Sequence, residues 1–210
     1  VDYFLRLPWG KMKEILQYGL FPKIKLVVRL PDGNLCYFRP FVGGDMTAID
    51  EIYYEGSYDV IQSLAERGII IDAGAHIGLF SMKIARLVGN KGVIIAIEPH
   101  SSNFQLLTKN LRANKCDNAV PLNVALSDSC GNVKLYVSPY SVSHSVTRRS
   151  DRWINVQSKT LDEIIRDYPA INFNMGVLFY QMGQEHDALD YFMRERELYG
   201  NNVKICKYIG

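Results

Sequence analysis

The sequence of 210 residues predicts an α/β fold with a doubly wound, mainly parallel sheet. Short apolar runs of strand length alternate with amphipathic stretches of helix length, which is typical of parallel strands joined through helices. The apolar runs are continuous, as expected of strands that are covered on both faces. A glycine turn over residues 72–78 joins the first of these runs to the helix that follows it.

Composition and charge narrow the class of protein. The chain has 48% hydrophobic and 22% charged residues, the ordinary balance of a globular domain, and is long enough for one core with a small appendage. Its net charge of +2, without a basic block, argues against a nucleic-acid partner. No apolar run approaches the roughly 20 residues of a membrane span. The four widely spaced cysteines predict neither a zinc site nor a disulfide framework, and we expect a cytoplasmic protein.

Residues 1–60 are predicted to form an N-terminal extension. A helix is expected over residues 11–18. It is followed by a β-hairpin whose strands, 25–30 and 35–38, flank the turn sequence Pro-Asp-Gly-Asn. An aromatic and acidic segment over residues 50–59 then leads toward the core.

Residues 61–168 are predicted to form the core, as alternating strands and helices. Strands are expected over 69–71, 93–97, 119–126 and 133–137, and helices over 79–88 and 101–114. Ser101 or Ser102 is the expected cap of the second helix. Thr160 and Glu163 have the spacing of a capping box, which predicts the start of a further helix.

The turn over residues 72–78 carries the strongest signal for a binding site, because ligands of open parallel sheets bind at the carboxyl ends of the strands. Gly74 lets the backbone turn tightly and approach a ligand without a Cβ in the way. Gly78 lets the following helix pack close to the strand. The second strand ends in Glu98 and Pro99, where a carboxylate can accept both hydroxyls of a ribose. The two elements converge on a nucleoside.

The glycine spacing distinguishes between nucleoside cofactors. A dinucleotide site needs the pattern G-x-G-x-x-G, whose second glycine lets a pyrophosphate approach the helix N-terminus. His76 occupies that position here. A turn of the form D-x-G-x-x-x-G suits a cofactor without phosphate, with Asp72 near a cationic amino group. The residues therefore favour S-adenosylmethionine, and an NAD-dependent enzyme is the weaker alternative.

Several segments resemble, in order, the motifs of the FkbM family of S-adenosylmethionine-dependent methyltransferases. They span roughly residues 25–168 and comprise a pre-core segment (51–59), IDAGAHIGLFS (71–81), AIEPHSSNF (96–104) with Leu107, Asn110 and Asn114, LNVALSD (122–128) and TLDE (160–163). The resemblance implies a Rossmann-like, class I methyltransferase core. It also implies O-methylation of a small-molecule acceptor, a sugar or another metabolite with a hydroxyl.

The resemblance further implies which residues hold the cofactor. Asp72, Gly74 and Gly78 would hold the methionine end, Glu98 the ribose, and the strand end at 123–125 would lie near the adenine. The predicted cofactor-binding residues are Asp72, Gly74, Ala75, His76, Gly78, Glu98, Pro99, Asn123, Ala125 and, as a hypothesis for the amino group, Glu55.

The sequence identifies no catalytic base. Methyl transfer is an in-line displacement, so the protein chiefly positions the acceptor oxygen. His144, in a polar loop after a predicted strand, is a candidate base, although a surface histidine in a serine-rich loop is the commoner case. The histidines and cysteines have no metal-ligand spacing, and no metal is expected.

The resemblance ends after the TLDE motif. The family continues there into a strand reading approximately KIDVEG, which lines the acceptor side of the site, whereas residues 168–173 read YPAINF. Residues 169–210 are predicted to form a helical hairpin that resembles a tetratricopeptide repeat, with its helices joined at Gly183. The alternative function is accordingly a non-catalytic, cofactor-binding fragment or relic whose helical tail binds a partner protein.

Overall fold

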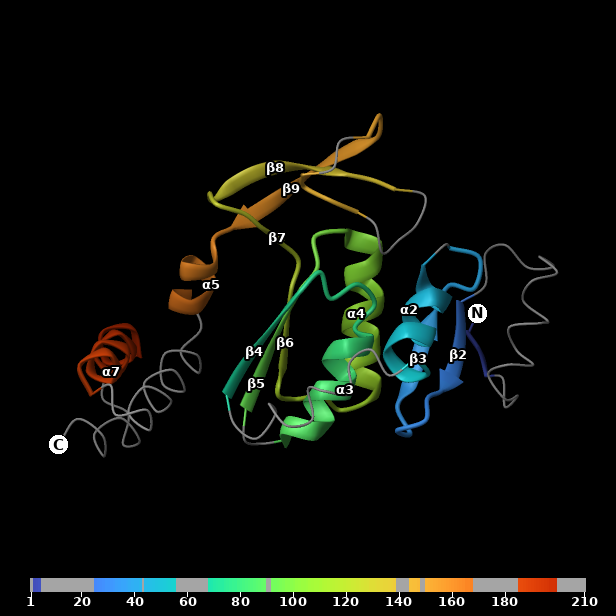
Figure 1. Cartoon of the computed structure of the whole chain (residues 1–210), viewed down its shortest axis with the longest axis horizontal. Coiled ribbons are helices and arrows are strands. Elements are labelled where there is room, and N and C mark those ends of the chain that lie inside the picture. Colours follow the sequence, from blue (N-terminus) through green and yellow to red (C-terminus); the bar gives the residue numbers. More distant parts are fainter. Residues whose placement is uncertain are drawn as a thin grey trace.

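The computed structural model describes residues 2–4, 25–42, 44–55, 68–89, 92–138, 144–147, 150–167 and 185–199. The described strands form three sheets of three strands each, and two helices separate the central sheet from the N-terminal one (Figure 1). The predicted helix over residues 11–18 and the first helix of the predicted C-terminal hairpin lie outside the described residues.

The central sheet is parallel. It contains β4 (Gly68–Ala73), β5 (Gly92–Ile97) and β6 (Ala119–Leu122), adjacent in that order. α3 (Leu79–Val88) connects β4 to β5, and α4 (Ser101–Ala113) connects β5 to β6. The predicted alternation of strands and helices in an α/β fold is confirmed. Within the described part of the chain β4 pairs with β5 alone, so β4 forms one edge of this sheet.

Helices cover both faces of the central sheet. Val88 of α3 packs on Ile94 on one face, and Ile164 of α5 (Leu161–Asp167) packs near Ile95 on the other. Neighbouring residues of β5 serve opposite faces because side chains alternate along a strand. Each isoleucine buried in this way contributes about 1.5–3 kcal/mol to folding. The continuous apolar run of β5 therefore contributes side chains to the hydrophobic clusters on both faces of the sheet.

The N-terminal sheet contains the predicted hairpin. β2 (Lys25–Arg29) and β3 (Leu35–Phe38) are antiparallel, and β1 (Asp2–Phe4) pairs with β2 in parallel. α2 (Asp45–Tyr53) follows and packs beside α3. The sequence did not predict α2. It begins after Gly44 and has no side-chain cap, so the usual start signal is missing.

Two asparagines of α4 attach the hairpin to the core. Asn110 Oδ1 accepts the Tyr37 N–H at 2.7 Å, and Asn110 Nδ2 donates to the Tyr37 carbonyl at 3.0 Å. Asn114 forms the same pair of bonds with Leu35, at 2.7 and 2.8 Å. Asn110 Nδ2 also donates to the Ile77 carbonyl at 2.8 Å, which ties the glycine turn to this junction. Side-chain amides thus replace a neighbouring strand along the edge of β3.

The third sheet corrects two predicted strands. β7 (Ala125–Leu126), β9 (Trp153–Lys159) and β8 (Gly131–Tyr136) lie in that order, above the central sheet in Figure 1. The predicted strand over 119–126 is divided between the central and third sheets. The predicted strand over 133–137 forms an antiparallel pair with β9 instead of extending the parallel sheet.

The helix caps agree with the prediction in one case and contradict it in the other. The Thr160 hydroxyl accepts the Glu163 N–H at 3.1 Å, so the predicted cap of α5 is confirmed. The N-cap of α4 is His100 rather than Ser101 or Ser102, and it makes no side-chain capping bond. The Ser102 hydroxyl instead contacts the His100 ring at 3.1 Å.

α7 (Glu185–Tyr199) is the described part of the predicted C-terminal hairpin. Ala188 and Phe192 of this helix are each only 1% exposed. Among the described helices, none combines the length and the apolar character needed to cross a bilayer.

Candidate functional site

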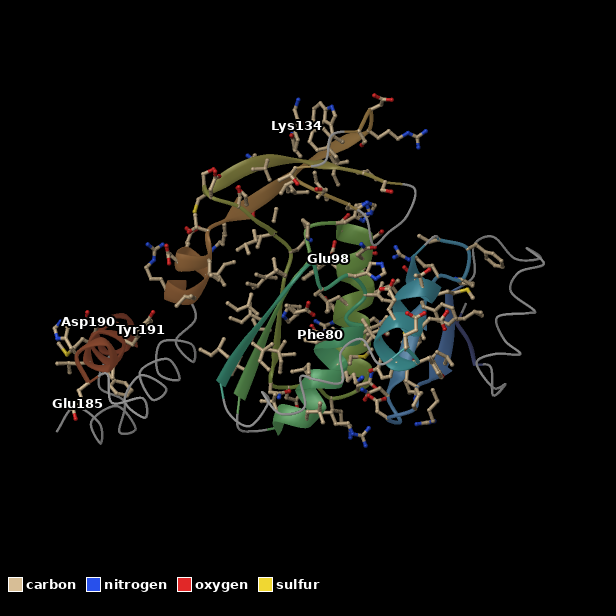
Figure 2. All side chains as sticks on the ribbon, in the orientation of Figure 1. Phe80, Glu98, Lys134, Glu185, Asp190 and Tyr191 are labelled. Carbon is tan, nitrogen blue, oxygen red and sulfur yellow. The ribbon has the colours of Figure 1, made fainter. Side chains whose placement is uncertain are left out.

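A cavity of about 380 Å³ lies at the carboxyl end of β4. Four predicted site residues of the glycine turn line it: Asp72, Gly74, Ala75 and His76. The α2 helix contributes another part of the wall, through Ala48, Glu51 and Ile52. Phe80, labelled in Figure 2, lines the cavity from the first turn of α3. The cavity therefore lies between the predicted turn and a helix of the N-terminal extension.

The turn is built from residues in the left-handed region of backbone space. Gly74, His76 and Gly78 have φ values of +86°, +52° and +88°. The amides of Gly74 and Ala75 both donate to the Ile97 carbonyl at 2.9 Å, which joins the turn to the end of β5. Glycine avoids the steric penalty of this conformation, whereas His76 incurs it, so neighbouring contacts must hold His76 in place.

Gly74 leaves room for a ligand. A Cβ placed on this residue would meet no other atom within 4 Å, and its φ of +86° strains any side chain. Gly74 and Ala73 are exposed at the turn. The open space beside the backbone is what a cofactor needs in order to approach it closely.

Asp72 is a poorly solvated carboxylate at the end of β4. The Ser81 hydroxyl donates to Asp72 Oδ2 at 2.6 Å. Burial raises the pKa of Asp72 to about 6, although the hydrogen bonds from Ser81 oppose this rise. A cation placed beside Asp72 would lower this pKa, because it stabilises the ionised carboxylate.

Glu98 holds the turn from the adjacent strand. It is 4% exposed, and Glu98 Oε2 accepts the His76 N–H at 2.9 Å. Glu98 Oε1 accepts the His100 N–H at 2.9 Å and Asn103 Nδ2 at 3.4 Å. Burial raises the pKa of Glu98, and these hydrogen bonds oppose the rise. A carboxylate has about four acceptor positions, so little capacity is left for a ribose.

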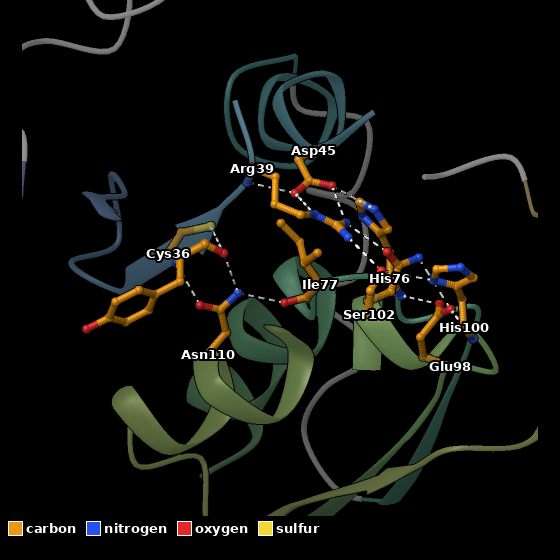
Figure 3. A network of polar contacts seen from close by, with 11 residues as sticks. Cys36, Arg39, Asp45, His76, Ile77, Glu98, His100, Ser102 and Asn110 are labelled. Carbon is orange, nitrogen blue, oxygen red and sulfur yellow. Dashed lines mark hydrogen bonds and ion pairs between the residues drawn. The ribbon is translucent and has the colours of Figure 1, made fainter. Parts of the chain in front are cut away.

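A buried ion network fixes His76 from the side of the extension (Figure 3). Asp45 is fully buried, and its Oδ1 lies 3.1 Å from His76 Nε2 and 2.8 Å from Arg39 Nη2. Arg39 Nη2 also donates to Asn103 at 2.7 Å, and Arg39 Nη1 to Ser102 at 3.0 Å. Burial would raise the pKa of Asp45, but the hydrogen bonds from His76 and Arg39 and their positive charge lower it to about 2. The network joins three separate segments around the turn.

His144 lies beside His100 at the end of β5 and not on the cavity. The two ring centroids are 4.3 Å apart, and His144 Nδ1 accepts the Ser138 N–H at 3.1 Å. Burial lowers the pKa of His144 to about 4, with further lowering from His100, His76 and Arg39. His144 is therefore neutral near pH 7 and weakly basic, and its role as a base stays a prediction.

The residues predicted near the adenine have structural contacts. Asn123 Nδ2 donates to the carbonyls of Glu98 and Pro99, at 2.8 and 3.2 Å. Ala125 is 1% exposed and belongs to β7. Asn123 thus braces the ends of two neighbouring strands, and only its exposed side could face a ligand.

The extension contributes residues that the sequence did not single out. Glu55, the hypothesised contact to the amino group, is exposed beyond the end of α2 and is not part of the cavity lining. Glu51, one helical turn earlier, lines the cavity instead. Arg39 and Asp45 escaped notice because nothing in their local sequence shows that they meet the turn. The pre-core motif, which begins at Glu51, was the sequence signal that could have indicated Glu51 as a site residue.

Comparisons with known proteins agree with the predicted family. Residues 72–173 match the family model described as a methyltransferase FkbM domain. The chain is 37% identical over 90 residues to the methyltransferase sdnD of Sordaria araneosa, an alignment that covers 42% of this chain. The chain spans about a third (34%) of the length of this curated relative.

Two solved structures also match. The crystal structure of M. jannaschii TYW2 in complex with AdoMet has a TM-score of 0.35 and 23% identity, and covers 50% of this chain and 47% of that chain. The crystal structure of the M. jannaschii tRNA m1G37 methyltransferase has a TM-score of 0.36 and 16% identity, and covers 60% and 44% of the two chains.

The family match confirms the resemblance seen in the sequence. It begins at Asp72, the first residue of the turn that lines the cavity, and it includes Glu98. Members of this family use S-adenosylmethionine as the methyl donor, which agrees with the cofactor predicted from the turn. Over residues 72–173 the chain therefore matches the methyltransferase FkbM domain that the sequence resemblance predicted.

Proposed function

We propose that the chain binds S-adenosylmethionine with its methionine end in the cavity between the glycine turn and α2, and that it methylates a hydroxyl of a small acceptor such as a sugar or another metabolite. The observation that carries this proposal is the open face of Gly74 at a cavity of about 380 Å³, beside the poorly solvated carboxylate of Asp72. Bound S-adenosylmethionine supplies an electrophilic methyl group to the acceptor oxygen, whose proton passes to a base or to water.

The residues of the chain fit this cofactor by charge and by shape. Asp72 offers an anion to the α-ammonium, and Gly74 offers a backbone surface without a side chain. No arginine or lysine is among the described residues that line the cavity, which suits a ligand without phosphate. Glu98 and Asn123 support the proposal indirectly, because they hold the strand ends and the turn in position.

The first test is the binding of S-adenosylhomocysteine, measured by calorimetry. The wild-type chain should bind it, and Gly74→Val should weaken binding by more than about tenfold because the new side chain fills the cavity. Gly131→Val is the matched control. Gly131 also has a positive φ (+139°) and no atom within 4 Å of an added Cβ, but it lies in β8, away from the cavity. This variant should be strained to a similar extent and still bind.

The outcomes separate the proposal from its alternatives. Binding of NAD without binding of S-adenosylhomocysteine would indicate a dinucleotide enzyme. Cofactor binding without transfer of a labelled methyl group to any sugar or metabolite hydroxyl would favour the non-catalytic fragment. The edge position of β4 among the described strands, and the third of the relative's length that the chain spans, are the observations behind that second candidate.

The affinity for S-adenosylhomocysteine should depend on pH through Asp72. The pKa of about 6 means that this carboxylate is largely ionised at pH 7 and largely protonated at pH 5. An ionised Asp72 attracts the ammonium and a protonated one does not, so affinity should fall as the pH falls. We expect a loss of about tenfold between pH 7 and pH 5, measured by calorimetric titration at each pH.

Asp72→Asn provides the control for this pH dependence. The variant should bind more weakly at pH 7, and its affinity should change little over the same interval because the titrating group is gone. A wild-type affinity that is constant between pH 5 and pH 7 would show that Asp72 does not contact the ammonium.

A further inference from the structure

The α2 wall of the cavity lies outside the segment that matches the family, which begins at residue 72. α2 is nevertheless held firmly against the core. Ile49 is fully buried within the same hydrophobic cluster as Leu79, and Lys83 Nζ donates to the Ile52 carbonyl at 2.9 Å. Glu51, the residue before Ile52, lines the cavity from this helix. The packing of Ile49 and the hydrogen bond at Ile52 therefore fix the backbone position of Glu51.

The cavity is lined by acids from two separate elements. Asp72 comes from the end of β4 and Glu51 from α2, and no arginine or lysine is among the described lining residues. Both carboxylates attract a cation that enters the cavity. The arrangement selects a ligand whose inserted end carries a positive charge.

One ammonium group can donate hydrogen bonds to both carboxylates, Asp72 and Glu51. It carries three N–H donors and no acceptor. Asp72 already accepts the Ser81 hydroxyl at Oδ2, which leaves the remaining positions of this carboxylate for one part of the ammonium. Glu51 is exposed at the cavity, so its carboxylate can reach the ligand without being desolvated beforehand.

We propose that Glu51 is a specificity-determining residue that binds, together with Asp72, the α-ammonium of the cofactor's methionine end. The inference rests on the proposed function and extends it. The glycine turn accounts for the close approach of the cofactor to the backbone, whereas the acid on α2 makes the site select an α-amino acid over the corresponding deaminated acid. The N-terminal extension then supplies part of the cofactor site and is more than a structural support.

A thermodynamic cycle between the protein and the ligand tests this assignment. The two ligands are S-adenosylhomocysteine and its deaminated analogue, which keeps the carboxylate and lacks the ammonium. The two proteins are the full wild-type chain and Glu51→Gln. Wild type should prefer S-adenosylhomocysteine, and Glu51→Gln should lose about tenfold of that preference, because the charge partner of the ammonium has been removed.

Asp50→Asn is the matched control, since it removes the same charge from the neighbouring position of the same helix. Asp50 is not among the cavity-lining residues, and this variant should keep the wild-type preference between the two ligands. A general effect of negative charge on α2 would lower the preference equally in both variants and would overturn the assignment of Glu51.

The remaining outcomes separate this inference from the proposed function. If wild type binds S-adenosylhomocysteine and Glu51→Gln keeps the full preference, the inference is wrong and the proposed function stands. If Glu51→Gln weakens both ligands by the same factor, Glu51 has a structural role only. If wild type binds neither ligand, the proposed function fails and the inference fails with it.

Discussion

Replacing Asp45 by Asn should lower the free energy of unfolding by about 3–5 kcal/mol, the usual cost of breaking a buried ion pair on one side. Asp45 is fully buried and Arg39 is 13% exposed, so the guanidinium would keep its charge in a poorly solvated place. In either orientation the amide NH2 of Asn would face an N–H donor of Arg39. Chemical denaturation followed by circular dichroism measures the loss.

Two further variants show whether the lost ion pair is the cause. Asp50→Asn makes the same chemical change in the same helix, where the carboxylate is only half-buried, and should cost less than about 1 kcal/mol. The double variant Arg39→Met/Asp45→Leu leaves no unpaired charge and should be more stable than Asp45→Asn. A loss in Asp45→Asn no larger than that in Asp50→Asn would contradict the role assigned to the network.

The sequence predicts the central sheet well because its signals are local. β5 is a continuous apolar run, and α3 follows a glycine at the N-terminal end and stops at another at the C-terminal end, so both were predicted to within one residue. α2 lacks a capping side chain, and β9 is a mostly exposed strand without an apolar run. These two elements are defined by pairing and packing with distant segments, which no local pattern reports.

The candidate site also contains residues that the local sequence predicts and residues that only the folded structure brings together. Asp72, Gly74 and His76 lie in one short turn, and their grouping is visible in the sequence. The contact between Arg39 and Asn103 joins residues 64 positions apart, and only the folded chain brings them together. The role of Glu98 also needed the structure, because a strand-end acid that could bind a ribose is seen to accept the amides of His76 and His100.

Gly78 is the position where the turn tolerates a side chain least. Its φ of +88° lies in the left-handed region, which costs an L-residue about 1–2 kcal/mol. A Cβ built on Gly78 would also lie 2.6 Å from Leu107 Cδ1 and 3.5 Å from the Leu107 Cα. Leu107 is fully buried in α4, so it can move only by disturbing the core. The close approach of α4 to the start of α3 therefore depends on the absence of this Cβ.

Gly78→Ala should lower the free energy of unfolding by about 2–5 kcal/mol, the sum of the backbone strain of about 1–2 kcal/mol and the overpacking of about 1–3 kcal/mol. Gly74→Ala separates the two contributions. Gly74 has nearly the same φ (+86°) in the same turn, and an added Cβ there meets no atom within 4 Å, so this variant carries the strain without the contact. The difference between the two variants, measured by denaturant unfolding, is the cost of the contact with Leu107. Equal losses would mean that Leu107 yields freely and that Gly78 is required by its backbone conformation alone.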